Sequence, residues 1–197
     1  MTARLDLVVG CNGAGKTTLV TEQLLPILNT PFVNADEIAK RRWPDDPEAH
    51  AYEAAAIAAD TRSALITRHR SFIAETVFSH PSKLDLIDQA HDHDFRVVVH
   101  VVVVPENYAV ERVRLRVAHG GHTVPVQKIR QRYQRVWPLS VTAIKRGDQA
   151  AVYDNRGRRT RVLARFFDGL PTTGPEWPEW MPAAFTDTWP GVDDHSL

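Results

Sequence analysis

The sequence contains a single cysteine, Cys11, and lacks any long run of apolar residues. One cysteine excludes an internal disulfide framework. The longest apolar stretch lies at 97–104, is interrupted by His100, and falls well short of the roughly 20 residues that a membrane helix needs. Residues 1–9 include Arg4 and Asp6 and lack the apolar core of a signal peptide. We therefore expect a cytoplasmic protein that does not cross a membrane.

An excess of charge of either sign is also missing, because 24 Lys and Arg balance 24 Asp and Glu. A chain without net charge is not suited to coat nucleic acid or an anionic membrane. The sequence also lacks the aromatic platform, interleaved with basic residues, that is typical of single-strand binding. We therefore do not expect a nucleic-acid partner. The 197 residues, 43% of them hydrophobic, are enough for one globular domain with its own core.

What the sequence does contain is an alternation of predicted strands and helices. Short apolar or β-branched runs predict strands at 5–9, 32–34, 71–74, 96–104, 150–153 and 161–167. Helices are expected at 16–25, 47–69, 81–91, 106–118 and 125–137. Strands that alternate with helices predict an α/β fold of three layers, with a mostly parallel central sheet and helices on both faces.

A glycine-rich loop follows the first predicted strand. Residues 10–17 match G-x-x-x-x-G-K-[ST], the phosphate loop (P-loop) in which backbone N–H groups and a helix N-terminus hold nucleotide phosphates. Lys16 is expected to reach the β- and γ-phosphates, and the Thr17 hydroxyl to bind Mg²⁺. Cys11 is either a small residue tolerated in this loop or a thiol activated by its N–H dipoles. The predicted ATP-binding residues are Asn12, Gly13, Ala14, Gly15, Lys16, Thr17 and Thr18.

Two acidic residues, Asp36 and Glu75, follow short apolar runs, and we take them as the only acids at strand ends. The carboxyl ends of parallel strands meet at one crevice, where the P-loop also lies. Two carboxylates there suit a kinase that acts on a hydroxyl: one accepts its proton, and the other holds the substrate or a metal-bound water. The alternative is that Asp36 caps a helix beginning at Glu37.

A basic segment at 111–135 contains seven cations and a single acid, Glu111. Arg112 and Arg116 are four residues apart and share a helix face, whereas Arg114 lies off it. Two helices joined by a mobile connection at 120–125 are typical of a phosphoryl-transfer lid, spanning about 106–137, that brings guanidinium groups to the phosphate. The alternative is a solvated charged face. The seven cations are Arg112, Arg114, Arg116, Lys128, Arg130, Arg132 and Arg135.

The C-terminal part of the chain adds two further features. A second basic cluster is expected either to line the nucleotide or to form a surface hairpin; it consists of Arg156, Arg158, Arg159 and Arg161. From about residue 171, five prolines and three tryptophans predict a tail without regular structure whose rings dock on the domain. We therefore predict a P-loop kinase domain at 1–170 and a packed tail at 171–197.

With these motifs the chain resembles the zeta-toxin family of P-loop kinases, over roughly residues 5–167. The resemblance rests on the P-loop, on Phe32-Val33-Asn34-Ala35-Asp36-Glu37, on Ala74-Glu75-Thr76, on Gly121-His122-Thr123-Val124-Pro125 and on Val152-Tyr153-Asp154-Asn155. It implies ATP- and Mg²⁺-dependent phosphorylation of a hydroxyl of UDP-N-acetylglucosamine. It also implies a small antitoxin protein as a partner.

The resemblance further implies roles for single residues. Lys16 matches the P-loop lysine and Asp36 the general base, whereas Glu75, Thr76 and His122 fall on the substrate side. The second lid arginine of the family matches Arg132 or Arg135. The first matches Arg116 or His122.

Other classes of function remain open at this stage. A P-loop kinase for another hydroxylated metabolite or an antibiotic has the same motifs. A nucleotide-binding module that regulates a partner without chemistry would not need two convergent acids. A polynucleotide kinase is disfavoured by the zero net charge. A guanine-specific N-K-x-D motif, a motor-type hhhh-D strand and the dinucleotide pattern G-x-G-x-x-G are all absent from the sequence.

Overall fold

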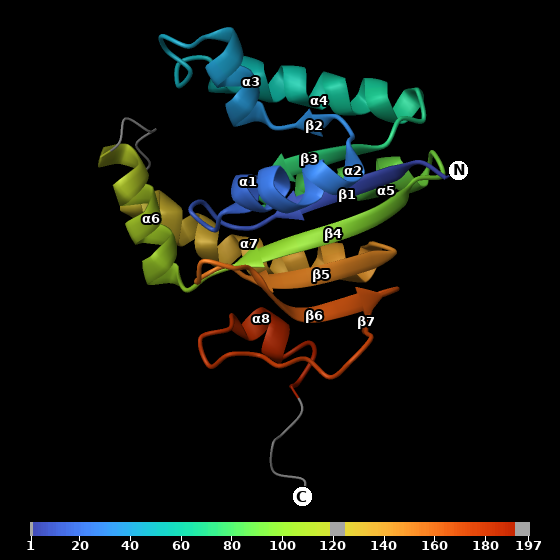
Figure 1. Ribbon diagram of the computed structural model, residues 1–197, viewed down its shortest axis with the longest axis vertical. Coiled ribbons are helices and arrows are strands. Elements are labelled where there is room, and N and C mark those ends of the chain that lie inside the picture. Colours follow the sequence, from blue (N-terminus) through green and yellow to red (C-terminus); the bar gives the residue numbers. More distant parts are fainter. Residues whose placement is uncertain (1, 119–124, 192–197) are drawn as a thin grey trace, which may run out of the picture.

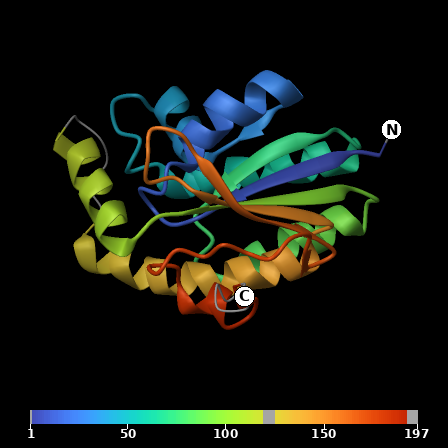
Figure 2. The same cartoon turned by 60° about the horizontal axis from the view of Figure 1, so that its bottom comes forward.

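A seven-stranded sheet forms the centre of the computed structural model, which describes residues 2–118 and 125–191. The strand order is β2-β3-β1-β4-β5-β6-β7. Helix α1 lies on one face of the sheet, and α5 and α7 lie on the other (Figures 1 and 2). The predicted three-layer α/β fold is thereby confirmed.

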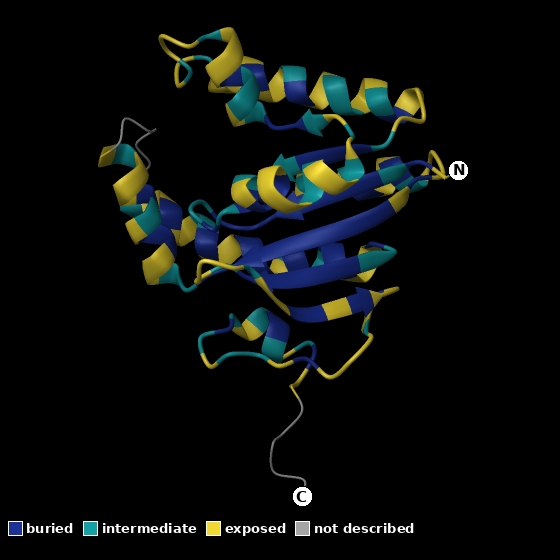
Figure 3. Ribbon diagram, viewed as in Figure 1, coloured by how far each residue is buried: buried dark blue, intermediate teal, exposed yellow. Residues whose placement is uncertain are grey.

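The first five strands are parallel and the last two are antiparallel, because a hairpin joins β5 to β6 and a tight turn joins β6 to β7. Strand β4 lies at the centre and is buried on both faces beyond Arg96, as its β-branched sequence predicts (Figure 3). The strands are β1 Arg4–Val9, β2 Phe32–Val33, β3 Phe72–Thr76, β4 Arg96–Val103, β5 Gln149–Asp154, β6 Arg161–Phe167 and β7 Leu170–Pro171.

The helices connect the strands; α3 was not among the expected helices, α4 begins four residues later than expected, and in two places a helix continues past a proline at which its end was expected. The helices are α1 Lys16–Leu19, the π-helical η1 Val20–Leu24, α2 Leu25–Leu28, α3 Ala35–Arg42, α4 Ala51–Thr67, the 3₁₀ turn η2 Pro81–Lys83, α5 Asp85–His91, α6 Glu106–Ala118, α7 Val126–Arg146 and α8 Ala183–Thr186. The first departure is at Pro26, where helical structure continues to Leu28. This proline lies in the first turn of α2, at a position that does not require its missing N–H.

The second departure is helix α7, which does not end at residue 137 but continues through Pro138 to Arg146. A proline inside a helix costs about 3 kcal/mol. Val141, Ala143 and Ile144, beyond the proline, are buried in the core, and burial of a large aliphatic side chain contributes about 1.5–3 kcal/mol. Burial of this apolar stripe therefore outweighs the missing hydrogen bond. No helix within 2–118 and 125–191 combines the length and the apolar composition that crossing a membrane requires.

Three strands share a polar cluster inside the sheet that the sequence analysis did not anticipate. His100 of β4 makes hydrogen bonds with Asp6 of β1 through Nε2 (2.8 Å) and with the Tyr153 hydroxyl of β5 through Nδ1 (3.0 Å). Buried polar groups are stable only when they are paired. The cluster therefore fixes the three strands relative to one another.

The C-terminal segment contains regular structure, contrary to the expectation of none. Leu170–Pro171 pairs with β6 across the turn at 168–169, and Ala183–Thr186 forms α8. The Phe185 ring is fully buried and contacts Trp137 of α7 at a centroid distance of 6.0 Å. Trp177 Nε1 donates a hydrogen bond to the Trp189 carbonyl (2.7 Å). The predicted boundary between a domain and a tail at residue 171 stays a prediction. The contact of Phe185 with Trp137 joins the residues on the two sides of that boundary.

We predict that Phe185→Ala lowers the free energy of unfolding by about 3–5 kcal/mol, because it removes a fully buried ring and leaves a cavity beside Trp137. Phe167→Ala serves as the matched control, since this ring is 55% exposed and its loss should change stability by about 0.5 kcal/mol or less. Urea unfolding followed by tryptophan fluorescence measures both. Equal losses would show that the segment at 171–191 contributes no packing of its own.

Candidate functional site

The P-loop connects β1 to α1 and is held by contacts with the chain after β5. Gly15 precedes the helix in a left-handed conformation, with φ 89°. A side chain at this position would collide with the Asn155 amide, which donates a hydrogen bond to the Ala14 carbonyl (2.8 Å). Gly15 is therefore needed both for its backbone conformation and for this close approach.

Lys16 is buried within the loop, and its Nζ donates a hydrogen bond to the Cys11 carbonyl (2.9 Å). The ammonium group is thus held in place before any phosphate is present. Cys11 is fully buried, and burial raises the pKa of its thiol to about 11. The thiol is therefore protonated near neutral pH, and the alternative of an activated thiolate is wrong.

Glu75 lies at the carboxyl end of β3 and accepts a hydrogen bond from the Thr17 hydroxyl, with distances of 2.9 and 3.1 Å to its two carboxylate oxygens. Burial raises the pKa of Glu75, and the Lys16 charge and the Thr17 hydrogen bond oppose that shift. The structure thus places Glu75 beside Thr17, the predicted metal ligand, and the expectation that Glu75 holds the substrate or a metal-bound water stays a prediction.

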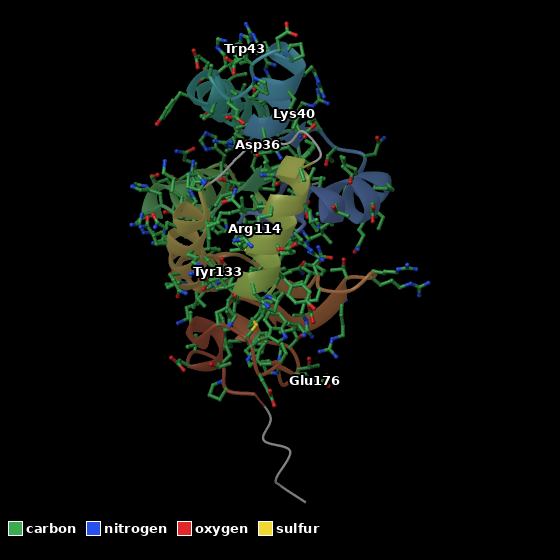
Figure 4. The ribbon with its side chains drawn as sticks, turned by 90° about the vertical axis from the view of Figure 1, so that its left-hand side faces the viewer. Asp36, Lys40, Trp43, Arg114, Tyr133 and Glu176 are labelled. Carbon is green, nitrogen blue, oxygen red and sulfur yellow. The ribbon has the colours of Figure 1, made fainter. Side chains whose placement is uncertain are left out.

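Asp36 lies in the first turn of α3, and its carboxylate is exposed toward the site. The Asn34 side chain caps this helix by accepting a hydrogen bond from the Asp36 backbone N–H (2.8 Å). The alternative that Asp36 is itself the cap is therefore wrong. The negative charge of Asp36 contributes to the raised pKa of Glu75, which indicates that the two carboxylates lie near each other. Figure 4 shows Asp36 and Lys40 on α3 above α6.

One cavity of about 1090 Å³ joins these groups. Pockets for single small-molecule ligands measure roughly 300–1,000 Å³, so this cavity has room for a nucleotide and a second molecule. Its lining comes from the P-loop, α3, the end of β3, the two lid helices and the β5–β6 hairpin. The side chains that line the cavity include Lys16, Thr17, Thr18, Asp36, Glu75, Thr76, Arg112, Arg116, Arg132, Asn155, Arg158 and Arg159.

The arginines of the predicted lid divide into two groups. Arg116 and Arg132 both line the cavity, and Arg132 Nη1 lies 3.5 Å from the Asn12 side-chain oxygen. Arg135 is exposed and lies outside the cavity lining. The predicted His122, and the connection at 120–124 that contains it, lie outside the described residues. Of the predicted phosphate-binding residues, Ala14 is buried and offers only its backbone.

Two site residues, Arg112 and Asn155, were not chosen from the sequence. Arg112 Nη2 donates a hydrogen bond to the Asn155 carbonyl (2.8 Å), and the Asn155 side chain in turn contacts the P-loop. The signal for Arg112 was its shared helix face with Arg116. Arg114, on the other face, is exposed and lies 3.9 Å from Glu111.

The second basic cluster also divides between two roles. Arg156 bonds to Asp154 (2.9–3.1 Å), and its guanidinium lies 4.6 Å from the centre of the Trp180 ring, whereas Arg158 and Arg159 line the cavity. Asp154 ends strand β5, so the expectation that Asp36 and Glu75 are the only acids at strand ends is wrong. Asp154 is buried and paired with Arg156, and it therefore serves the hairpin.

Solved structures of similar fold include toxins and kinases. A chain of the AvrRxo1-ORF1:AvrRxo1-ORF2 complex with sulphate ions matches with a TM-score of 0.70 and 15% identity, over 87% of this chain and 61% of that chain. The PezAT toxin–antitoxin system of Streptococcus pneumoniae matches with a TM-score of 0.61 and 10% identity, over 83% and 72%. Shikimate kinase from Acinetobacter baumannii, in complex with shikimate, matches with a TM-score of 0.51 and 19% identity, over 80% and 86%.

These identities are low, so the matches show the fold alone, and this chain spans about 61% of the matched AvrRxo1 chain. A search of curated protein sequences found no match. A family model described as an AAA domain matches residues 5–139, which is more than half of the chain and includes the P-loop, Asp36, Glu75 and both lid helices up to residue 139. By its sequence the chain therefore belongs to this AAA domain family, whose P-loop fold is of the kinase-like kind.

Proposed function

We propose that this protein is a kinase that uses ATP and Mg²⁺ to phosphorylate a hydroxyl group of a small molecule. The observation that carries the proposal is that one cavity contains the P-loop, two carboxylates (Asp36 in the first turn of α3 and Glu75 at the end of β3) and two arginines from the predicted helical lid. A module that only bound nucleotide would not need the carboxylates. Similar folds include a complex solved with ATP and a shikimate kinase, which supports a phosphotransferase.

The phosphate side of the site is formed by the P-loop. Lys16 and the backbone N–H groups at the start of α1 would bind the β- and γ-phosphates. Thr17 and Glu75 present oxygen atoms at the same place, and Mg²⁺ prefers oxygen ligands, usually one or two carboxylates or hydroxyls together with phosphates. These residues therefore fit the ion, which when bound neutralises charge on the transferring phosphate.

Asp36 is the proposed general base. Its carboxylate is exposed in the cavity, and Asn34 rather than Asp36 caps α3, so the carboxylate is available to accept a proton. An acceptor hydroxyl hydrogen-bonded to Asp36 would lose its proton as the oxygen attacks the γ-phosphate. Arg116 and Arg132 would stabilise the charge that spreads over the γ-phosphate oxygens in the transition state.

For the acceptor we propose a sugar nucleotide such as UDP-N-acetylglucosamine, following the resemblance to the zeta-toxin family. The toxin–antitoxin system among the similar folds supports this choice and, with it, a small antitoxin as partner in the cytoplasm. The second candidate is another hydroxylated metabolite, favoured by the shikimate kinase match. A metabolite panel incubated with ATP, followed by mass identification of the phosphorylated product, distinguishes the two.

The first prediction concerns the phosphate site. Mg·ATP should raise the melting temperature of the protein, because a ligand bound only by the folded state stabilises that state. Lys16→Ala should abolish most of the shift, whereas Lys128→Ala, an exposed lysine of the lid outside the cavity, should retain it. Differential scanning fluorimetry measures all three proteins. An unchanged melting curve at millimolar Mg·ATP would refute nucleotide binding.

The second prediction concerns the general base. Asp36→Asn should lower phosphoryl transfer by roughly 10²-fold or more with little change in ATP affinity, because the amide cannot accept the proton. Asp45→Asn makes the same change at an exposed residue of the α3–α4 connection and should leave turnover intact. ADP release in a coupled assay measures the rates. Retained turnover in the Asp36 variant would exclude this carboxylate as the base.

The third prediction concerns the lid. Arg116→Ala and Arg132→Ala should each lower kcat on the order of 10³-fold while the affinity for ATP changes much less, since the charge they stabilise develops only in the transition state. Arg114→Ala is the control, because Arg114 is exposed and pairs with Glu111 away from the cavity. Steady-state kinetics with the identified acceptor separates the two effects. Equal behaviour of all three variants would identify the arginines as a solvated surface.

A further inference from the structure

A second, smaller cavity of about 180 Å³ lies beside the main one. It is lined by α4, the end of β3, η2 and the start of α5. Glu75, Thr76 and Lys83 line both cavities, so the two are neighbours at the carboxyl end of β3. Nothing in the proposed phosphate chemistry uses the far side of this smaller cavity.

Two cationic side chains line the smaller cavity from different elements: Arg62 from α4 and Lys83 from η2. Both are half-buried. Within the described part of the chain neither of them forms an ion pair or a hydrogen bond. Burial lowers the pKa of each group, and the positive charge of Arg62 lowers the pKa of Lys83 further. Two neighbouring cations are therefore partly desolvated without a counter-charge, which is unfavourable until an anion binds.

The two carboxylates that also line this cavity do not supply that counter-charge. Glu75 is engaged with the Thr17 hydroxyl, and Asp85 is exposed in the first turn of α5, where a negative charge is favourable for the helix. Neither lies within ion-pair distance of Arg62 or Lys83 in the residues that the structure describes. The cation pair is consequently free to bind an anion from solution.

We propose that Arg62 and Lys83 form an anion-binding subsite that recognises a carboxylate or phosphate group of the acceptor, so that the protein phosphorylates anionic hydroxyl compounds in preference to neutral ones. The proposal rests on the kinase function proposed above. The cavity is smaller than the roughly 300–1,000 Å³ of whole-ligand pockets, so it accepts a group of the acceptor and not the entire molecule. The rest of the acceptor would lie in the main cavity, with its hydroxyl at Asp36.

The specificity follows from the cost of leaving the two cations unpaired. An acceptor with a suitably placed anion gains charge-assisted hydrogen bonds from the guanidinium and the ammonium. A neutral polyol of the same shape leaves both groups partly desolvated and unpaired. Hydroxy acids and sugar phosphates share the anionic group and differ in its geometry: Arg62 can bind either with two parallel hydrogen bonds, and Lys83 acts as a point charge.

The first experiment measures anion binding without catalysis. The P-loop is saturated with Mg²⁺ and a non-hydrolysable ATP analogue, and inorganic phosphate is then titrated while binding is followed by protein NMR. Arg62→Gln and Lys83→Gln should each weaken phosphate binding about tenfold or more. Arg68→Gln removes an exposed charge near the end of the same helix and should leave binding unchanged. Arg62→Lys and Lys83→Arg retain the charge and should restore most of the affinity.

Equal phosphate affinity in the wild type and both Gln variants would overturn the subsite. So would loss of affinity in Arg68→Gln as well, because that result would indicate a general surface effect. The melting temperature of each variant is measured in parallel. If one Gln variant is unfolded, the other decides, because loss of either cation should weaken phosphate binding.

The second experiment compares acceptors at equal concentration: glucose, gluconate and glucose 6-phosphate. Preference for gluconate assigns the subsite to carboxylates, and preference for glucose 6-phosphate assigns it to phosphates. Arg62→Gln and Lys83→Gln should raise the KM of the preferred anionic acceptor about tenfold with a smaller change in kcat. Equal use of glucose by the wild type would overturn the specificity. Failure of the kinase proposal gives a different result, since the wild type would then phosphorylate none of the acceptors, whereas the phosphate titration still reports on the subsite.

Discussion

The hydrogen bond from the Thr17 hydroxyl to the Glu75 carboxylate is the interaction on which the site depends. It joins the first turn of α1 to the end of β3, and thereby holds the P-loop residue Thr17 against the Glu75 carboxylate. Because β1 and β3 are adjacent and parallel, their carboxyl ends lie at one edge of the sheet. Burial raises the pKa of Glu75 there, and the charge of Lys16 opposes that shift.

The lid depends on the same edge of the sheet through a different chain of contacts. Arg112 of α6 bonds to the Asn155 carbonyl, and the Asn155 amide bonds to the Ala14 carbonyl in the P-loop. The first lid helix, the β5–β6 hairpin and the phosphate loop are thus connected by two hydrogen bonds. Gly15 permits this arrangement because a larger residue would displace Asn155.

Much of the fold could be predicted from the sequence, because its signals are local. The β-branched run of β4 and the glycine pattern of the P-loop specify a buried parallel strand and a phosphate loop without knowledge of distant residues. The continuation of α7 through Pro138 could not be predicted from the sequence. It depends on burial of Ile144 and its neighbours against elements that are far away in the sequence. The site shows the same difference between local and distant signals. Asp36 and Lys16 could be proposed from their positions in sequence motifs. The contacts of Asn155 and Arg112 join residues more than forty positions apart, so the sequence did not reveal them.

The stacking of Arg156 on Trp180 makes the C-terminal segment and the nucleotide cavity thermodynamically linked. Arg156 belongs to the hairpin whose next residues, from Gly157 to Thr160, line the cavity, while Trp180 belongs to the segment that docks through Phe185. If docking of the segment orders the hairpin, then whatever binds to the hairpin must in turn favour docking, because such couplings are reciprocal. The segment at 171–191 would then act as a weak effector of the cavity that the P-loop lines.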